Sequence, residues 1–260
     1  MRQHSISEFK IEKLTVKIYP DAQKSVIAAA WDTREAIKSL LREQKQVTIL
    51  MQAVPAKQEF CEDLFREPDL DWTRVVFLFT NEFSGLPENA IQNSGTLMSR
   101  FLSKGKKFKE IFFMNDYAQE LTDDCRRYEK ILKKNPVDIA CIDISGDGHI
   151  AFNEPNRVDI DDKESIRRIE LSDIIRQYFV NEKLFANFSK VPEHGITLTI
   201  PAIMKAKIIN CTVSSRIKVS QLERALKDRI SNAHPASPLR NHHSATIYLD
   251  SEIAGRLHIN

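Results

Sequence analysis

Glycine and cysteine are scarce in this chain of 260 residues, which contains 7 glycines and 4 cysteines. No low-complexity tract is present. The cysteines, at positions 61, 125, 141 and 211, are far apart and form no pair of the kind that binds metals. Cys141 and Cys211 lie in apolar runs, where a buried thiol behaves as a small hydrophobe. This usage favours a reducing, cytoplasmic environment.

Long apolar runs and an excess of charge of one sign are also missing. No apolar run approaches the roughly 18 residues of a transmembrane helix, so no membrane span is expected. The first ten residues lack the apolar core of a signal peptide. With 38 basic and 36 acidic residues, the net charge of +2 gives no reason to expect a nucleic-acid partner. The length predicts a single domain over residues 1–260.

What the sequence does contain is a regular alternation of apolar runs and amphipathic segments. Strands are predicted at 9–18, 47–51, 75–80, 111–114, 137–144, 195–200, 207–213 and 245–249, and helices at 21–42, 58–65, 90–102, 120–134, 172–179 and 219–226. Segments 81–87 and 157–169 are predicted to be loops, the second with an extended end. The alternation indicates βαβ units and an α/β fold of three layers, a doubly wound, mostly parallel sheet of Rossmann-like type.

One stretch, Ser-Gly-Asp-Gly-His-Ile-Ala-Phe-Asn-Glu-Pro at 145–155, follows a buried strand, where open α/β sheets place their ligands. Asp147 and His149 are two residues apart, so a tight turn brings the carboxylate to an imidazole N–H and sets its tautomer. We expect the loop to curl so that Glu154 reaches the same histidine. These residues suit proton transfer near neutral pH.

A calcium site is the rival interpretation of this stretch. Residues 143–154 match the spacing of an EF-hand loop, with Gly148 at its sixth position. Three features of the sequence argue against it: a strand precedes the loop, Pro155 stands where the exiting helix would continue, and no second hand is present. His242 and His243 are adjacent but lack a third ligand. We therefore expect no metal.

Residues 146–155 closely resemble the signature of glucosamine-6-phosphate deaminases, which share a superfamily with 6-phosphogluconolactonases. The tail Phe-Asn-Glu-Pro is typical of the deaminase branch. Segments 79–87, 191–201, 213–218 and 235–243 are similar to other family segments, in order and spacing. The resemblance extends from about Val47 to the end of the chain and implies the deaminase/phosphogluconolactonase type of fold.

The resemblance also implies a reaction. Such enzymes open the ring of glucosamine 6-phosphate, move a proton between C2 and C1, and release ammonia to give fructose 6-phosphate, with no metal or organic cofactor. By this mapping His149 opens the ring, Asp147 and Glu154 orient it, and Lys218 contacts the phosphate. Gly146 and Gly148 of the signature would line the substrate.

The sequence departs from the family pattern in three features. Asn81 replaces the aspartate that serves as the enolisation base, and losing such a base costs roughly 10²–10⁴-fold in rate. Glu82 is adjacent, but consecutive residues of an extended segment point to opposite sides. Gln52 and Ala53 replace glycines of the phosphate loop, where glycine lets backbone N–H groups approach a phosphate. A family arginine falls near Gln177, with Arg176 beside it as a candidate.

The sequence thus leaves several functions open. The first is an amino-sugar-phosphate deaminase/isomerase, or a close variant acting on a related sugar. The second is a homologue with impaired catalysis that binds a sugar or a protein partner. The third is a lactonase-like hydrolase, which the Phe-Asn-Glu-Pro tail disfavours. A ring-opening or isomerising activity on a non-phosphorylated sugar also fits a retained histidine without its base. A small-molecule sugar is expected as ligand, and a homo-oligomer remains open.

Overall fold

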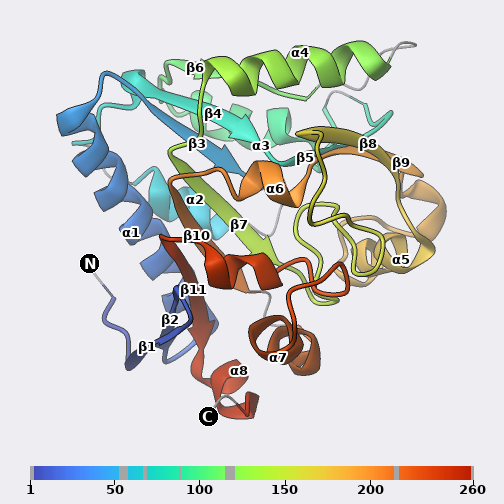
Figure 1. Cartoon of the computed structure of the whole chain (residues 1–260). Coiled ribbons are helices and arrows are strands. Elements are labelled where there is room, and N and C mark those ends of the chain that lie inside the picture. Colours follow the sequence, from blue (N-terminus) through green and yellow to red (C-terminus); the bar gives the residue numbers. More distant parts are fainter. Residues whose placement is uncertain are drawn as a thin grey trace.

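The computed structural model describes residues 3–52, 58–66, 69–87, 89–114, 121–213 and 217–258. Eight strands form the main sheet in the order β1-β2-β11-β10-β7-β3-β4-β6 (Figure 1). Their bounds are β1 (Ser7–Ile11), β2 (Leu14–Tyr19), β3 (Val47–Met51), β4 (Val75–Phe79), β6 (Glu110–Ile111), β7 (Ile139–Ile144), β10 (Ile208–Val213) and β11 (Ala245–Asp250). Every neighbouring pair is parallel except β1 with β2. The predicted α/β class with a mostly parallel sheet is confirmed.

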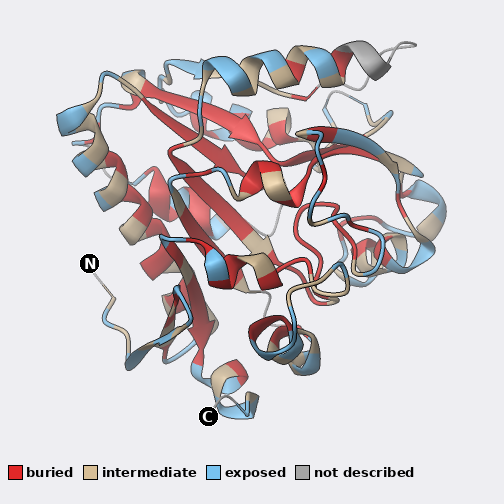
Figure 2. Cartoon of the chain, in the orientation of Figure 1, coloured by how far each residue is buried: buried red, intermediate tan, exposed pale blue. Residues whose placement is uncertain are grey.

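Helices cover both faces of this sheet, because alternate side chains of each strand point to opposite sides. On β3, Ile49 and Met51 join a core with α1 (Ala22–Glu43), α2 (Gln58–Leu64) and α3 (Ser94–Leu102). Leu50 joins the opposite core, with α4 (Leu121–Lys134), α6 (Ile200–Ile203), α7 (Val219–Lys227) and α8 (Ser251–Arg256). Figure 2 shows the central strands as the most continuously buried part of the chain.

The predicted start of α1 is confirmed in detail. Asp21 has an extended backbone, and its side chain accepts a hydrogen bond from the backbone N–H of Lys24 at 2.8 Å. This satisfies one of the N–H groups that a helix leaves free at its N-terminus. No helix in the described part of the chain is both long and apolar enough to cross a membrane.

A second, smaller sheet was not predicted. It contains β5 (Asn81–Phe83), β9 (His194–Leu198) and β8 (Ile166–Glu170), antiparallel in the order β5-β9-β8. Segment 81–87 is therefore not entirely a loop, and the apolar run 195–200 lies outside the main sheet. Both sheets bury apolar side chains, so hydrophobic pattern alone could not assign β9 to one of them. Helix α5 (Asp173–Asn181) packs on this small sheet through Phe83, Phe179 and their neighbours.

Two further boundaries differ from prediction. The strand predicted at 9–18 is a hairpin, in which Glu12 turns with a φ of 54°. Helix α3 starts at Ser94 rather than near residue 90, because the carboxylate of Glu82 accepts the backbone N–H of Ser94. Short 3₁₀ helices occupy Trp72–Arg74, Phe188–Lys190 and Ser237–Asn241.

Candidate functional site

The signature loop (residues 145–154) begins where β7 ends, at the carboxyl edge of the main sheet. Its first turn is closed by the N–H of Gly148, which donates to the carbonyl of Ser145 at 2.8 Å, and by the N–H of Ser145, which donates to the carbonyl of His149 at 3.0 Å. Gly148 has a φ of +92°, a conformation that residues with a side chain rarely adopt. The loop is therefore a compact turn that returns His149 to the strand end.

His149 and Asp147 form the pair that the sequence predicted. Nδ1 of His149 hydrogen bonds Oδ1 of Asp147, and the imidazole is 1% exposed. Burial by itself would raise the pKa of Asp147, but the hydrogen bond from His149 and the charge of the imidazole outweigh it, so the pKa lies below its usual value. With Nδ1 as the donor to Asp147, the Nε2 atom of a neutral His149 is left as the proton acceptor.

Two rings of α5 enclose the imidazole. Tyr178 and Phe179 meet His149 edge-on, with centroid distances of 5.1 and 5.9 Å. The hydroxyl of Tyr178 also accepts the N–H of Gly146 at 3.4 Å, and burial raises the pKa of this tyrosine to about 12. Tyr178 therefore remains protonated near neutral pH. Sequence reasoning missed it, because its only signal was its place beside the apolar face of a predicted helix.

Glu154 does not contact His149 as expected. Its carboxylate accepts the backbone N–H of Ser172 at 3.1 Å and the Ser172 hydroxyl, and Nε of Arg157 lies 3.9 Å away. Ser172 is the N-cap of α5, and the N-terminus of a helix attracts a carboxylate. The predicted contact of Glu154 with His149 is therefore wrong. Glu154 instead anchors α5 to the signature loop, and it acts on His149 only through the rings of that helix.

Phe152 and Asn153 fasten the loop to the small sheet. The side-chain amide of Asn153 donates to the carbonyl of Leu198 at 2.9 Å, and the N–H of Phe152 donates to Thr197 Oγ1 at 3.3 Å. The ring of Phe152 lies against Gly195, where an added Cβ would approach it to 2.6 Å. A glycine inside a strand is the sequence signal for such a close approach. The Phe-Asn-Glu tail thus fixes the position of the loop.

Asn81, in the place of the family's base, is completely buried at the start of β5. Its Oδ1 accepts the hydroxyl of Thr80 at 2.7 Å, while its Nδ2 has no hydrogen-bond partner among the described residues. An unpaired buried donor is costly and calls for an explanation.

Glu82 does not supply the base that is missing at position 81, because its carboxylate is bound elsewhere. Its carboxylate accepts the N–H and the hydroxyl of Ser94 at 2.9 and 2.6 Å, and the N–H of Phe83 at 3.1 Å. It therefore caps α3. Burial raises the pKa of Glu82 to about 7, although these hydrogen bonds act in the opposite direction.

Of the two predicted phosphate-loop residues, Gln52 and Ala53, the structure describes only Gln52. Gln52 is buried, and its side-chain oxygen accepts the N–H of Asp143 at 3.0 Å. Its backbone N–H donates to the carbonyl of Cys141 at 3.1 Å, so Gln52 joins the ends of β3 and β7. Ala53 lies outside the described residues.

Lys218 and Arg176, predicted to bind substrate, have different environments. Lys218 is exposed at the start of α7, and its backbone N–H donates to the carbonyl of Gly146 at 2.9 Å. It is therefore close to the signature loop. Arg176 instead donates to the carbonyl of Val191 at 3.2 Å, and its guanidinium lies 4.2 Å from the ring centroid of Phe188. These contacts hold the guanidinium against residues 188–191, and a substrate contact by Arg176 stays a prediction.

The calcium interpretation fails on geometry. The carboxylates of Asp143, Asp147 and Glu154 are hydrogen bonded to Thr212, His149 and Ser172, respectively, and so do not converge. Within the described residues no three metal-ligating side chains form a group. His242 uses both ring nitrogens, donating to the carbonyl of Ala206 at 2.8 Å and accepting the N–H of Ser244 at 3.1 Å.

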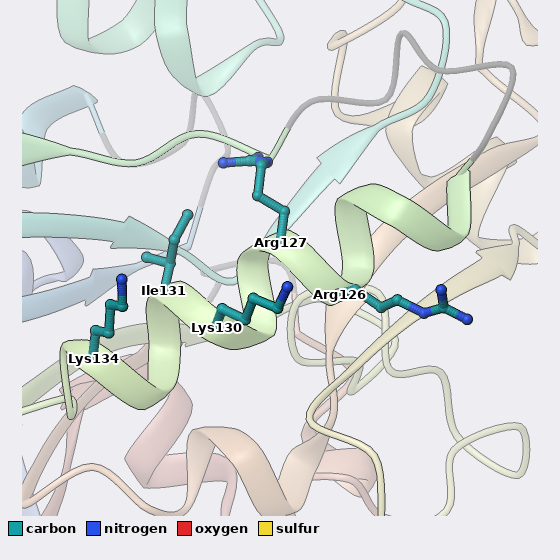
Figure 3. A pocket seen from close by; sticks show the side chains of 5 residues that line it. All are labelled: Arg126, Arg127, Lys130, Ile131 and Lys134. Atoms are coloured by element: carbon teal, nitrogen blue, oxygen red, sulfur yellow. The ribbon is translucent and has the colours of Figure 1, made fainter.

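A separate hollow of about 500 Å³ follows the surface of α4. Figure 3 shows the side chains that line it, which are Arg126, Arg127, Lys130, Ile131 and Lys134. Among the residues that the structure describes, no carboxylate or imidazole lines it, so the described lining lacks the groups needed for proton transfer. None of its residues belongs to the signature loop.

Fold and site together define a class: α/β proteins that hold a buried histidine, paired with an aspartate, in a loop at the carboxyl edge of a parallel sheet. Residues 20–248 match the family described as glucosamine-6-phosphate isomerases/6-phosphogluconolactonase. The chain belongs to this family, as the signature predicted, and the match starts before the predicted limit near Val47.

Relatives and solved structures agree with this assignment. Glucosamine-6-phosphate deaminases of Bacillus thuringiensis (strain Al Hakam) and Bacillus cereus (strain AH820) are each 34% identical over 187 residues, which cover 72% of this chain and 70% of the relative. A monomeric glucosamine-6-phosphate deaminase superposes with a TM-score of 0.78 at 24% identity, over 92% of this chain and 98% of that one. A 6-phosphogluconolactonase from Thermotoga maritima superposes with a TM-score of 0.72 at 17% identity, over 92% and 100%. The two structures show the shared fold.

Proposed function

We propose that this chain is an amino-sugar-phosphate deaminase/isomerase, with glucosamine 6-phosphate as its reference substrate. The observation that carries the proposal is the buried His149, whose Nδ1 is held by Asp147 at the carboxyl edge of the sheet. The names of the Bacillus relatives support the substrate class. The activity needs no cofactor in this scheme, because every step is a proton transfer or the loss of ammonia.

His149 would act first, on the closed sugar ring. Asp147 fixes the tautomer, so Nε2 takes the proton of the anomeric hydroxyl and returns a proton to the ring oxygen. An imidazole suits this exchange, since the same nitrogen can accept a proton and then return it. Asp147 also stabilises the imidazolium that forms between the two transfers.

The second step, removal of the proton from C2, would be slow in this chain. An amide at position 81 cannot accept that proton, and Glu82 is directed to Ser94 instead. Absence of a positioned general base typically costs roughly 10²–10⁴-fold. We therefore expect turnover well below the ~10 s⁻¹ of a median enzyme.

Ammonia release from glucosamine 6-phosphate tests the proposal, with wild type, Asn81→Asp and His149→Asn measured together. We expect slow release by the wild type, an increase of roughly 10²–10⁴-fold in Asn81→Asp, and none in His149→Asn. If neither wild type nor Asn81→Asp releases ammonia while both stay folded, the deaminase proposal is wrong.

A homologue that binds a sugar without turning it over is the second candidate. The unpaired amide of Asn81 favours it, because a buried donor is useful to a bound oxygen even where no base is present. Saturable binding of glucosamine 6-phosphate by calorimetry, with no product, would select this candidate. Hydrolysis of 6-phosphogluconolactone would instead select the lactonase interpretation.

A further inference from the structure

Asn81 lies beside the signature loop through a shared partner. Asn81 of β5 is paired directly with Thr197 of β9, and Oγ1 of Thr197 accepts the N–H of Phe152. Residues directly opposite in an antiparallel pair have side chains on the same face of the sheet. The amide of Asn81 is thus on the face of the small sheet that holds the loop carrying His149.

Nδ2 of this amide is a buried donor without a partner in the described residues, whereas its Oδ1 is satisfied by Thr80. The neighbouring carboxylates on the chain are engaged elsewhere, Glu82 with Ser94 and Glu154 with Ser172. At this position the site therefore offers a hydrogen-bond donor in place of a proton acceptor. A donor recognises an oxygen of the ligand.

We propose that the site catalyses anomer exchange of a hexosamine, by reversible opening and reclosing of the sugar ring, and that this exchange is faster than deamination. In the open form, Nδ2 of Asn81 donates a hydrogen bond to the carbonyl oxygen. The inference rests on the proposed function in that it uses the same site and the same first step. It goes beyond that function because most turnovers end when the ring recloses, before the proton on C2 is removed.

The exchange balances without a further reagent. His149 Nε2 takes the proton of the anomeric hydroxyl, whose O–H electron pair becomes the π bond of the new C1 carbonyl. The bond from C1 to the ring oxygen breaks, its electron pair stays on the ring oxygen, and the imidazolium delivers the proton there. Rotation about the C1–C2 bond and the reverse sequence close the ring as the other anomer.

No carbon–hydrogen bond breaks in this cycle, so Asn81 in place of an aspartate does not impede it. A neutral donor at the developing carbonyl oxygen favours the open form, as preorganised donors do at other reacting oxygens. Because the C2 step lacks its base, the open form recloses roughly 10²–10⁴ times for each ammonia released.

Proton NMR exchange spectroscopy on equilibrated glucosamine 6-phosphate measures anomer exchange, and an ammonia assay on the same sample measures deamination. In the wild type, exchange is expected to exceed both the spontaneous rate and ammonia release by at least ~100-fold. His149→Asn is expected to return exchange to the spontaneous rate. Asn81→Asp is expected to bring the two rates within about tenfold, because it restores a base.

Asn81→Leu separates ligand binding from a structural role. Leucine removes the unpaired donor but also the acceptor of the buried Thr80 hydroxyl, so the two effects on the free protein oppose each other and its melting temperature should change little. Anomer exchange should fall roughly 10²–10³-fold, the usual loss for one such donor. Gln23→Leu, which alters an exposed amide on α1, is the control and should change neither rate. If Asn81→Leu does not fold, the ratio of anomer exchange to ammonia release in Asn81→Asp still tests whether most turnovers end at ring reclosure.

The outcomes distinguish the inference from the proposed function. Wild-type exchange, with no ammonia released by either the wild type or Asn81→Asp, upholds the inference and refutes the deaminase proposal. Ammonia release with exchange no faster than deamination does the reverse. Exchange at the spontaneous rate with no ammonia refutes both, and an Asn81→Leu protein that exchanges at the wild-type rate refutes the role of the amide.

Discussion

Gly195 on β9 gives the sharpest test of how the signature loop is held. A Cβ at this position would lie 2.6 Å and 2.8 Å from two carbons of the Phe152 ring and 3.0 Å from the carbonyl oxygen of Glu82. Ordinary contact begins near 3.4 Å, so in Gly195→Ala the ring must move by most of an ångström. Phe152 is 2% exposed and has little room to do so.

Overpacking of this kind typically costs about 1–3 kcal/mol, which for a chain of this size lowers the melting temperature by roughly 2–10 °C. Because Phe152 is three residues from His149, we also expect lower activity in any assay that depends on this histidine. Urea unfolding and differential scanning calorimetry measure the stability. The double variant Gly195→Ala/Phe152→Leu should lose less free energy of unfolding than the two single variants lose together, because the smaller side chain relieves the contact.

Gly255→Ala in α8 is the matched control. Nothing lies within 4 Å of a Cβ at Gly255, and alanine is the better helix former by about 1 kcal/mol, so this variant should be level with or slightly more stable than the wild type. A Gly195→Ala protein that melts with the wild type would refute the close packing of Phe152 on β9.

Three more predictions concern the charged and capping groups of the site. Burial raises the pKa of Glu82 to about 7 from 4.5, so the folded state holds this proton more tightly than the unfolded state. The contribution of Glu82 to stability should therefore be greatest below pH 4.5 and fall by up to about 3 kcal/mol as the pH rises through 7. Glu82→Gln should remove this contribution from a stability curve measured by urea unfolding, and an unchanged slope between pH 4.5 and 7 would contradict the assignment. Ser172→Ala removes the N-cap of α5 and a partner of Glu154, so it should cost about 0.5–2 kcal/mol in chemical denaturation. Ser220→Ala, which changes an exposed serine in the first turn of α7, is a control expected to change little. Asp147→Asn removes the acceptor that fixes Nδ1 of His149 and should slow anomer exchange roughly 10²–10⁴-fold with little change in ligand affinity, whereas a full-rate variant would show that the pairing is not needed.

The parts of the molecule that the sequence predicted are those fixed by local residues. β3, β4 and β7 are buried on both faces, so their continuous apolar runs identified them as central strands. The pair of Asp147 and His149 was predictable because the two residues share one turn. The capping of α1 by Asp21 is equally local.

What the sequence could not predict depends on contacts between distant segments. Glu154 turns to Ser172, 18 residues away, because the N-terminus of α5 is brought there by folding. The small sheet joins β5 to β9 across more than 100 residues, and an apolar strand pattern does not identify its partners. Asn81 could be recognised as a changed residue, but only the structure shows that its amide nitrogen has no partner in the described part of the chain.

The bond between Glu154 and Ser172 has a consequence for how the site is lost on heating. It links the signature loop to α5, which in turn supplies the rings around His149. These segments should therefore open together as one cooperative unit in native-state hydrogen exchange, with a single opening free energy below that of the main sheet. The protein would then become inactive in a sub-global transition while its parallel sheet is still folded.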